Sequence, residues 1–346
     1  MTERLRVAVL AGGRSSEHEI SVNSARSVLE SLDADRYETV TVEIGRDGHW
    51  QLEPGRRREL TTGEQHAAET LPVPANGGVP ATLGEVDVVI PVLHGPFGED
   101  GTVQGLLELA GVPYVGAGVL GSALAMDKDK FKAVMRDAGI PVTRNITLRL
   151  GDEPRNPFGY PVFVKPARLG SSVGITKVRE ESELAAAVEL AFRHDEKVLV
   201  EEFVAGIEVE CGVLGNLKPI ASLPGEIVSH GFDQPDWYDY SAKYDEGGMD
   251  LIVPPRISEA QIERVQQLAV ESCVAAEVEG MARVDFFVRE DDGDVIVNEL
   301  NTIPGFTATS VYAKLFEASG IAYPELLDRL VELALERHER RSRLQF

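Results

Sequence analysis

The stretch that most constrains this chain is RVDFFVREDDGDVIVNELNTIPGFTATS, residues 283–310. Residues 283–288 and 295–300 are rich in β-branched and aromatic side chains, and the acidic sequence EDDGD between them is a turn signal. The pattern therefore predicts two strands joined by a turn, followed by a loop that contains glycine.

Polar side chains interrupt both predicted strands at positions that share a face. Because side chains alternate along a strand, Arg283, Asp285 and Phe287 lie on one face of the first strand. By the same rule Glu299 and Asn301 share a face of the second strand. The hairpin therefore gathers charged and amide groups on one surface.

A hairpin centred on Asp292 places Asp285 directly opposite Glu299. Opposed like charges destabilise a sheet, so a cation between the two carboxylates is the best explanation of such a pair. The amide of Asn301 completes a ligand set made of oxygens, which suits Mg²⁺ that also binds substrate phosphates. The alternative is a solvent-facing hairpin with ordinary surface acids, although an exposed strand is not normally so apolar at its other positions.

Composition limits the class of protein. The chain has 346 residues, a hydrophobic content of 43% and a formal net charge of −23. This length predicts two or three domains. The charge argues against nucleic-acid binding but leaves room for an anionic ligand in a local basic pocket. No apolar run is long enough to span a membrane and residues 7–11 are too short for a signal peptide, so we expect a cytoplasmic protein with reduced, structural thiols at Cys211 and Cys273.

The N-terminal part repeats a strand–loop–helix unit. Residues 5–10 and 86–93 are predicted buried strands, each followed by a Gly-containing loop and a helical pattern. Such units imply a parallel sheet with ligands at the carboxyl ends of its strands. Glu17 and His94 lie at that edge. A helix cap is the alternative role of Glu17, and a lone histidine such as His94 is more often structural.

The middle of the chain offers a second group of polar residues. Residues 158–178 contain two β-branched runs around the loop RLGSSVG, whose backbone N–H groups could hold phosphates, and Lys165 closes the first run. A simple hairpin turn is the alternative. Residues 197–203, KVLVEEF, read as a strand that presents backbone groups and carboxylates to an adenosine, unless these are surface acids. The lysines of MDKDKFK, residues 126–132, are also compatible with a solvated helix face.

Taken together, these features favour an Mg-ATP enzyme that activates a carboxylate. Metal ions and lysines neutralise phosphates, while backbone N–H groups and an arginine stabilise a developing oxyanion. A long irregular loop rich in aromatic residues, residues 232–254, is typical of a functional segment.

At this level of detail the chain resembles the D-alanine–D-alanine ligase family of the ATP-grasp superfamily. The motifs that carry the resemblance follow the family's order and cover most of the chain, although residues 50–80 match none. They are GGRSSEHEIS (12–21), LHGPFGEDG (93–101), MDKDKFK (126–132), VKPARLGSSVG (164–174), YDYSAKY (238–244), RVDFF (283–287) and NELNTIPGFTATS (298–310).

The resemblance implies an α/β and α+β protein of three domains. Residues 1–121 would form a Rossmann-like parallel-sheet domain that binds substrate, followed by a two-domain ATP-grasp fold in residues 122–215 and 216–346. The loop at residues 232–254 would be a lid over the site, and the family implies a homodimer that contacts neither nucleic acid nor membrane.

The resemblance also implies the ligands of the site. Two Mg²⁺ or Mn²⁺ ions would bind Asp285, Glu299 and Asn301. Trp237 stands where the family more often has another aromatic residue, and stacking on adenine should survive that change. The residues expected to contact ATP are Lys128, Lys165, Glu201, Val204, Glu208, Trp237, Lys243 and Phe287.

In the reaction that the family performs, the carboxylate of one D-alanine takes the γ-phosphate of ATP, and the amine of a second D-alanine displaces the phosphate. Glu17 would bind the ammonium group of the first D-alanine, with His94 nearby, and Ser310 would bind the carboxylate of the second. Arg283 and the Gly305 N–H would stabilise the oxyanion. A triad of hydrogen-bonded side chains would hold the lid: Glu17, Ser171 and Tyr244.

Three other functions remain open from the sequence. The first is another ATP-grasp ligase, such as one that makes D-alanyl-D-lactate, but Lys243 and Tyr244 retain the pattern that favours an amine nucleophile. The second is an ATP-binding module without catalysis, against which Arg283, Asp285 and Glu299 argue. The third is an α/β protein that binds a small ligand, which leaves the hairpin unexplained.

Overall fold

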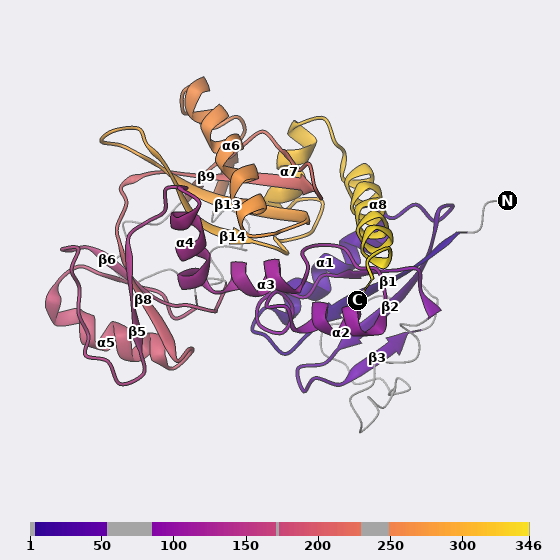
Figure 1. Ribbon diagram of the computed structural model, residues 1–346, viewed down its shortest axis with the longest axis horizontal. Helices are drawn as coiled ribbons and strands as arrows, with labels where there is room; N and C mark the ends of the chain where they lie inside the picture. Colours follow the sequence, from indigo (N-terminus) through magenta and orange to yellow (C-terminus); the bar gives the residue numbers. More distant parts are fainter. Residues whose placement is uncertain (1–3, 54–84, 171–172, 230–248, 346) are drawn as a thin grey trace.

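The computed structural model describes residues 4–53, 85–170, 173–229 and 249–345, and contains three sheets (Figure 1). The N-terminal sheet has the order β3-β2-β1-β4, in which β1, β2 and β4 run parallel and β3 is antiparallel to β2. This confirms the parallel sheet that the repeated units predicted. Its elements and the following helices are β1 (Leu5–Gly12), α1 (His18–Ser31), β2 (Tyr37–Ile44), β3 (Trp50–Glu53), β4 (Val88–Pro91), α2 (Thr102–Ala110), α3 (Val119–Met126) and α4 (Lys128–Asp137).

Alternation along β1 divides the N-terminal core into two layers. Val7 and Val9 face α1 and the C-terminal helices, whereas Ala8 and Leu10 face α2. The strand is buried on both sides, as expected for a parallel strand between helices. The carboxyl end of β1 therefore opens between two covered faces.

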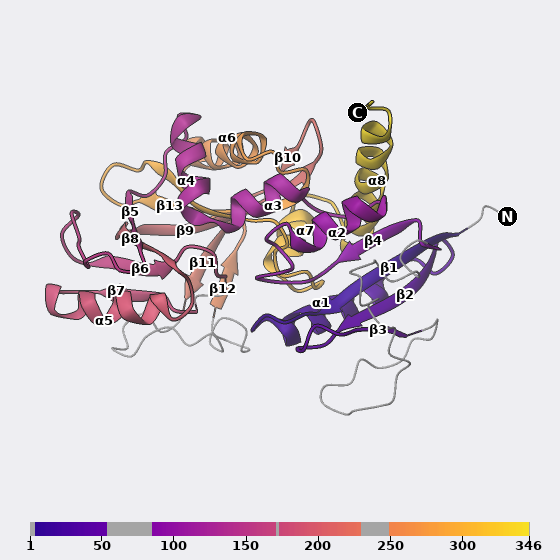
Figure 2. The same ribbon diagram turned by 60° about the horizontal axis from the view of Figure 1, so that its bottom comes forward.

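The central sheet is antiparallel, with the order β5-β8-β6-β7, and α5 covers its outer face (Figure 2). The two strands expected around the loop RLGSSVG are present as β6 and β7. The elements are β5 (Asn145–Arg149), β6 (Val162–Pro166), β7 (Thr176–Val178), α5 (Glu181–Phe192) and β8 (Lys197–Glu202).

The C-terminal sheet follows the order β12-β11-β9-β13-β14, with β10 paired to β9. The predicted hairpin is β13 and β14; β13 pairs with β9, and β14 is the last strand in the order. The elements are β9 (Gly206–Gly215), β10 (Ile220–Ala221), β11 (Gly225–Ser229), β12 (Met249–Ile252), α6 (Glu259–Ala275), β13 (Gly280–Arg289), β14 (Val295–Asn301), α7 (Val311–Ala318) and α8 (Tyr323–Ser342).

The C-terminal helices share a core with the N-terminal sheet. Phe316 of α7 and Leu330 of α8 belong to the same buried cluster as Val9 of β1. The buried guanidinium of Arg337 donates to the carbonyl of Tyr114 at 2.7 Å and lies 4.4 Å from the ring of that residue. The last helix is therefore bonded to the first domain, and the boundaries expected at 121/122 and 215/216 stay a prediction.

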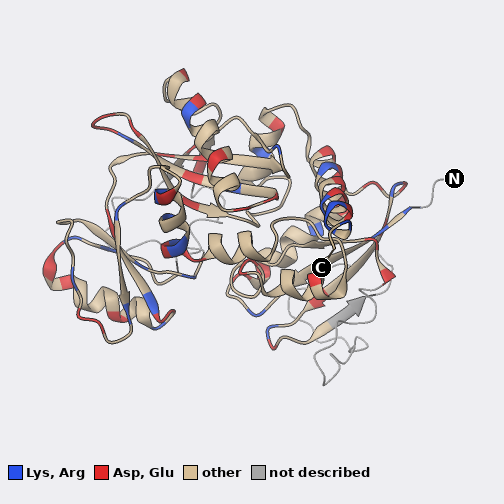
Figure 3. Ribbon diagram, viewed as in Figure 1, with Lys and Arg blue, Asp and Glu red and all other residues tan. Residues whose placement is uncertain are grey.

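Basic and acidic residues are spread over all parts of the fold, and α4 carries both kinds (Figure 3). Cys211 and Cys273 are free and buried, which agrees with structural thiols. In the parts of the chain that the structure describes, we find no helix with the length and apolarity needed to cross a membrane.

Candidate active site

The acid pair of the hairpin lies in a longer row of carboxylates. Asp285 of β13 is directly opposite Glu299 of β14, as the sequence predicted, and on its other side it is opposite Glu210 of β9. The sequence reasoning missed Glu210. Its signal was present, because Glu208 and Glu210 alternate with apolar residues in β9 and so share a face.

A β-bulge in β14 sets the register of this pair. Val288 is opposite Val295 near the turn, whereas Asp285 is opposite Glu299, so Asn298 is an extra residue on β14. A pairing centred on Asp292 therefore predicts the partner of Asp285 correctly, but it is wrong for the residues nearer the turn.

Two basic side chains neutralise the row in this structure. Arg283 Nε and Nη2 each donate to Asp285 at 2.7 Å, and Arg283 Nε also lies 2.9 Å from Glu210 Oε2. Lys128 Nζ lies 3.3 Å from Glu299 Oε2. Burial opposes the charge of Arg283, but the adjacent Asp285 and Glu210 carboxylates outweigh it and raise the pKa of Arg283 above its usual value. The solvent-facing hairpin is excluded, because these side chains are largely buried.

The oxygen donors of the hairpin fit a hard divalent cation. Asn301 Nδ2 is 3.0 Å from Asp285 Oδ2, so the amide lies against the acid pair and can offer its oxygen instead. No cluster of three or more His, Cys, Asp or Glu side chains suited to a metal occurs among the described residues. The set is therefore two carboxylates and an amide, which suits Mg²⁺ that takes further ligands from phosphates.

A fully buried ammonium group joins the central and C-terminal sheets. Lys132 Nζ donates to Thr143 Oγ1 and, at 2.7 Å, to the carbonyl of the bulge residue Asn298, and it lies 3.0 Å from Glu201 Oε2. Lys165 Nζ contacts the other oxygen of Glu201 at 2.5 Å. Lys132 thus has two hydrogen-bond acceptors and one ion-pair partner, and these contacts reach both sheets.

Burial and neighbouring charges shift the pKa values of Lys132 and Glu201. Burial lowers the pKa of Lys132 to about 8. Burial alone would raise the pKa of Glu201, but the Lys132 and Lys165 ammonium groups lower it to about 2. The solvated face considered for the lysines is wrong for Lys128 and Lys132, which are buried, and applies to Lys130.

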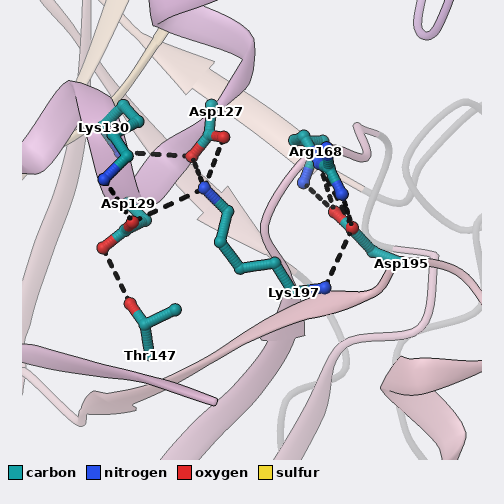
Figure 4. Close-up of polar contacts among 7 residues, drawn as sticks. All are labelled: Asp127, Asp129, Lys130, Thr147, Arg168, Asp195 and Lys197. Carbon is teal, nitrogen blue, oxygen red and sulfur yellow. Dashed lines mark hydrogen bonds and ion pairs between the residues drawn. The ribbon is translucent and has the colours of Figure 1, made fainter. Parts of the chain in front are cut away.

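Ion pairs join the start of α4, the residues around the start of β8, and Arg168 in the loop that follows β6 (Figure 4). Asp127 caps α4 and pairs with Lys197 at the start of β8. Arg168 pairs with Asp195 at 2.5 Å, just before the same strand. Lys128 adds a hydrogen bond from its backbone N–H to Ala167 and one from Nζ to Leu169, each at 3.0 Å. The first residues of this loop, 167–169, therefore have a defined position against α4, and the expectation that the loop holds phosphates stays a prediction.

Glu17 lies close to Gly170, in the loop that follows β6. A side chain at Gly170 would meet Glu17 Oε2 at 3.4 Å, and one at Gly95 would meet it at 2.6 Å. Glu17 stands at the start of α1 but its carboxylate makes no capping hydrogen bond, so the cap interpretation is wrong. Its expected triad partners, Ser171 and Tyr244, lie outside the described residues.

His94 and Ser310 border the loop after β14. The buried His94 ring contacts the Ile303 carbonyl through Nδ1 at 3.0 Å and Ser24 Oγ through Nε2 at 3.1 Å. Burial lowers the His94 pKa, but Glu99 and other acceptors outweigh this and raise it. Ser310 Oγ accepts from Thr307 N at 3.0 Å. His94 therefore connects α1 to the loop after β14, with one ring nitrogen contacting each.

The remaining expected ATP contacts are placed by the strands. Glu208 of β9 is opposite Phe287 of β13, on the same face as Asp285. Glu201 and Val204 are buried at the end of β8, so the interpretation of this segment as surface acid is wrong. A side chain at Gly305 would meet Ser310 Oγ at 3.4 Å, so these two residues are neighbours. Trp237, Lys243 and most of the expected lid at residues 232–254 lie outside the described residues.

Comparisons with known proteins agree with this geometry. Residues 6–117 match the family model described as D-ala D-ala ligase N-terminus, and residues 134–332 match D-ala D-ala ligase C-terminus. The chain is 48% identical to the D-alanine–D-alanine ligase of Mycolicibacterium gilvum, over 97% of this chain and 99% of the relative.

Two solved structures are similar over almost the whole chain. One is the D-alanine-D-alanine ligase from Coxiella burnetii, with a TM-score of 0.81 and 37% identity, covering 99% of this chain and 97% of that one. The other is the VanG D-Ala:D-Ser ligase from Enterococcus faecalis, with a TM-score of 0.79 and 35% identity, covering 96% of this chain and 100% of that one.

Proposed function

The chain belongs to the D-alanine–D-alanine ligase family, as its motifs indicated, and we propose that it joins two D-alanines into D-alanyl-D-alanine while ATP becomes ADP and phosphate. This confirms the expected combination of an N-terminal parallel-sheet domain with an ATP-grasp fold. The dipeptide would serve peptidoglycan precursor synthesis. The observation that carries the proposal is the acid pair of Asp285 and Glu299, with Arg283 against Asp285 and Lys128 of α4 against Glu299.

Two divalent cations, Mg²⁺ or Mn²⁺, would be held by Asp285, Glu299 and Asn301. When bound, they would supply positive charge that neutralises the phosphates during transfer. Lys128 and Lys165 would add to that charge from α4 and β6, where both ammonium groups already lie against carboxylates. The other proposed ATP contacts are Glu201, Val204, Glu208, Trp237, Lys243 and Phe287.

The reaction would proceed in two balanced steps. First, a carboxylate oxygen of one D-alanine bonds to the γ-phosphorus, the bond from that phosphorus to the β,γ-bridging oxygen breaks, and ADP leaves. Second, the amine of the other D-alanine attacks the carbonyl carbon, loses a proton, and phosphate departs as the amide forms. Arg283 and the Gly305 N–H would stabilise the oxyanion that develops on this carbonyl.

The substrates would be placed by residues at the carboxyl ends of β1 and β4 and in the loop before α7. Glu17 would bind the first ammonium group, and His94 would hold the surrounding loops in place through Ser24 and Ile303. Ser310 would bind the second carboxylate at the start of α7. A lid at residues 232–254, held by Glu17, Ser171 and Tyr244, would keep water from the acyl phosphate.

The identity of the second substrate depends on the lid. Lys243 and Tyr244 favour an amine, and a relative of known structure is described as a D-Ala:D-Ser ligase, so D-serine and D-lactate are the competitors to compare. Replacing Tyr244 by Phe should loosen the lid and increase depsipeptide formation from D-lactate. No gain in depsipeptide would contradict this specificity argument.

We also propose a cytoplasmic homodimer. Leu109 on α2 and Leu120 on α3 are 90% and 56% exposed, which favours an N-terminal interface between two copies. Light scattering of the purified chain and of Leu109→Glu would test this, since the charge should lower the measured mass toward that of a monomer.

The function is tested by phosphate release from ATP, Mg²⁺ and D-alanine, with L-alanine as the control and mass spectrometry of the dipeptide. Phosphate and dipeptide with D-alanine alone would support the proposal. ATP binding without phosphate release would identify a non-catalytic module instead. Product that appears only with D-lactate or D-serine added would move the assignment to another ligase.

A further inference from the structure

Arg283 is shared by two carboxylates of the acid row. Its Nε lies 2.7 Å from Asp285 Oδ1 and 2.9 Å from Glu210 Oε2, while Nη2 donates to Asp285 Oδ2 at 2.7 Å. The side chains of Arg283 and Asp285 are each 13% exposed, and that of Glu210 is 8% exposed. The guanidinium is therefore held in a site where an uncompensated charge would be strongly unfavourable.

The proposed cation site makes a competing demand on Asp285. Both oxygens of this carboxylate already accept from Arg283, and Oδ2 also accepts from Asn301. A divalent cation that binds the same oxygens would meet the positive guanidinium at short range, and the two would repel each other. Asp285 therefore cannot serve both groups fully, and Arg283 needs another carboxylate to remain where it is.

We propose that Glu210 is a positioning residue that retains Arg283 when Asp285 gives its oxygens to the cation. Strand register supports this role, because Glu210 lies directly beside Asp285 on the side away from Glu299. In this row Glu299 would serve the cation, Glu210 would serve the arginine, and Asp285 lies between them. The inference rests on the proposed function, since it assumes a cation at Asp285 and an oxyanion role for Arg283.

The test measures Mn²⁺ binding without ATP or D-alanine, by the loss of the free-ion electron paramagnetic resonance signal. In Glu210→Gln, Arg283 keeps its hold on Asp285, so Mn²⁺ should bind roughly tenfold more weakly than to the unaltered chain. Glu210→Asp keeps the charge but shortens the side chain, so it should also weaken binding if contact with Arg283 matters. Unaltered Mn²⁺ affinity in Glu210→Gln would overturn the proposal.

A general loss of negative charge would also weaken cation binding, and a double-mutant cycle separates the two causes. The effect of Glu210→Gln on Mn²⁺ affinity is compared in the unaltered chain and in Arg283→Met. If Glu210 acts through Arg283, the loss should be clearly smaller when the arginine is absent. An equal or larger loss in Arg283→Met would reduce Glu210 to a bulk charge and overturn the proposal.

Kinetics supply a second readout. Because Arg283 is expected to act on the oxyanion, Glu210→Gln should lower kcat at saturating Mn²⁺ at least about tenfold and change the KM for D-alanine little. A chain that makes no dipeptide but shows the Mn²⁺ coupling would contradict the proposed function and leave the arrangement of Arg283 standing. A chain that makes dipeptide without the coupling would do the reverse.

Discussion

Replacing Lys132 by Met removes a buried ammonium group and keeps a side chain of similar length. Lys132 is 0% exposed, and burial lowers its pKa from an ordinary value of 10.5 to about 8. The unfolded chain therefore holds this proton across a range of pH in which the folded chain has released it. Since stability rises with pH wherever the unfolded state binds more protons, the folded chain should gain stability between pH 8 and 10.5 from this residue.

The size of the gain follows from the two pKa values. When the pH rises from 7.5 to 9.5, the titration of Lys132 should raise the free energy of unfolding by about 2 kcal/mol, with most of the increase above pH 8. The Met side chain does not titrate. The other groups of the chain titrate alike in both proteins. The free energy of unfolding of the unaltered chain minus that of Lys132→Met should therefore be about 2 kcal/mol higher at pH 9.5 than at pH 7.5.

Urea unfolding followed by circular dichroism at the two pH values measures this change. Thr143→Val is a matched control, because it removes one acceptor of Lys132 and leaves the ammonium group to titrate. Its difference from the unaltered chain should depend on pH much less than that of Lys132→Met. The reasoning would be refuted if the free energy of unfolding of the unaltered chain minus that of Lys132→Met were equal at both pH values, or higher at pH 7.5.

Three other substitutions separate catalysis from stability. Asp285→Asn should lower phosphate release at least about 100-fold, because a cation ligand is lost, and near-normal turnover in the same coupled assay would contradict the metal assignment. Arg337→Leu should cost about 2–4 kcal/mol in urea unfolding, since the buried carbonyls of Tyr114 and Gly116 lose their donor; unchanged stability would show that water replaces it. Ser258→Ala removes the capping box of α6 and should cost about 1 kcal/mol with kcat unchanged, so a fall in kcat would reveal an unexpected link between α6 and the site.

The faces of the hairpin could be predicted from the sequence because they follow from a local rule. Alternation fixes which side chains share a surface, and the turn EDDGD fixes which strands pair. That was enough to place Asp285 opposite Glu299. Glu210 follows from the same alternation within β9, but its neighbour in space depends on the strand order of the sheet, which no local pattern specifies.

The partners of Lys132 illustrate a different limit. One acceptor is a side chain on β8 and another is the backbone carbonyl of Asn298, 166 residues further along the chain. A carbonyl has no signature in the sequence, since every residue carries one. The lysine therefore looked like part of a solvated face, and its burial became apparent from the way α4 lies between two sheets.

The bulge at Asn298 explains why the buried lysine and the acid pair occur together. Near the turn, the strands pair Val288 with Val295, and continuing that ladder would place Asn298 opposite Asp285. One extra residue in β14 instead brings Glu299 opposite Asp285. A bulge disrupts the ladder locally, and the carbonyl of the extra residue accepts from Lys132, whose other contacts reach Thr143 and the glutamate of the Lys165 pair. The amino group of Lys132 therefore donates to the same irregularity that brings Glu299 opposite Asp285. The two sheets that would enclose ATP are thus joined at the point where its cations are expected to bind.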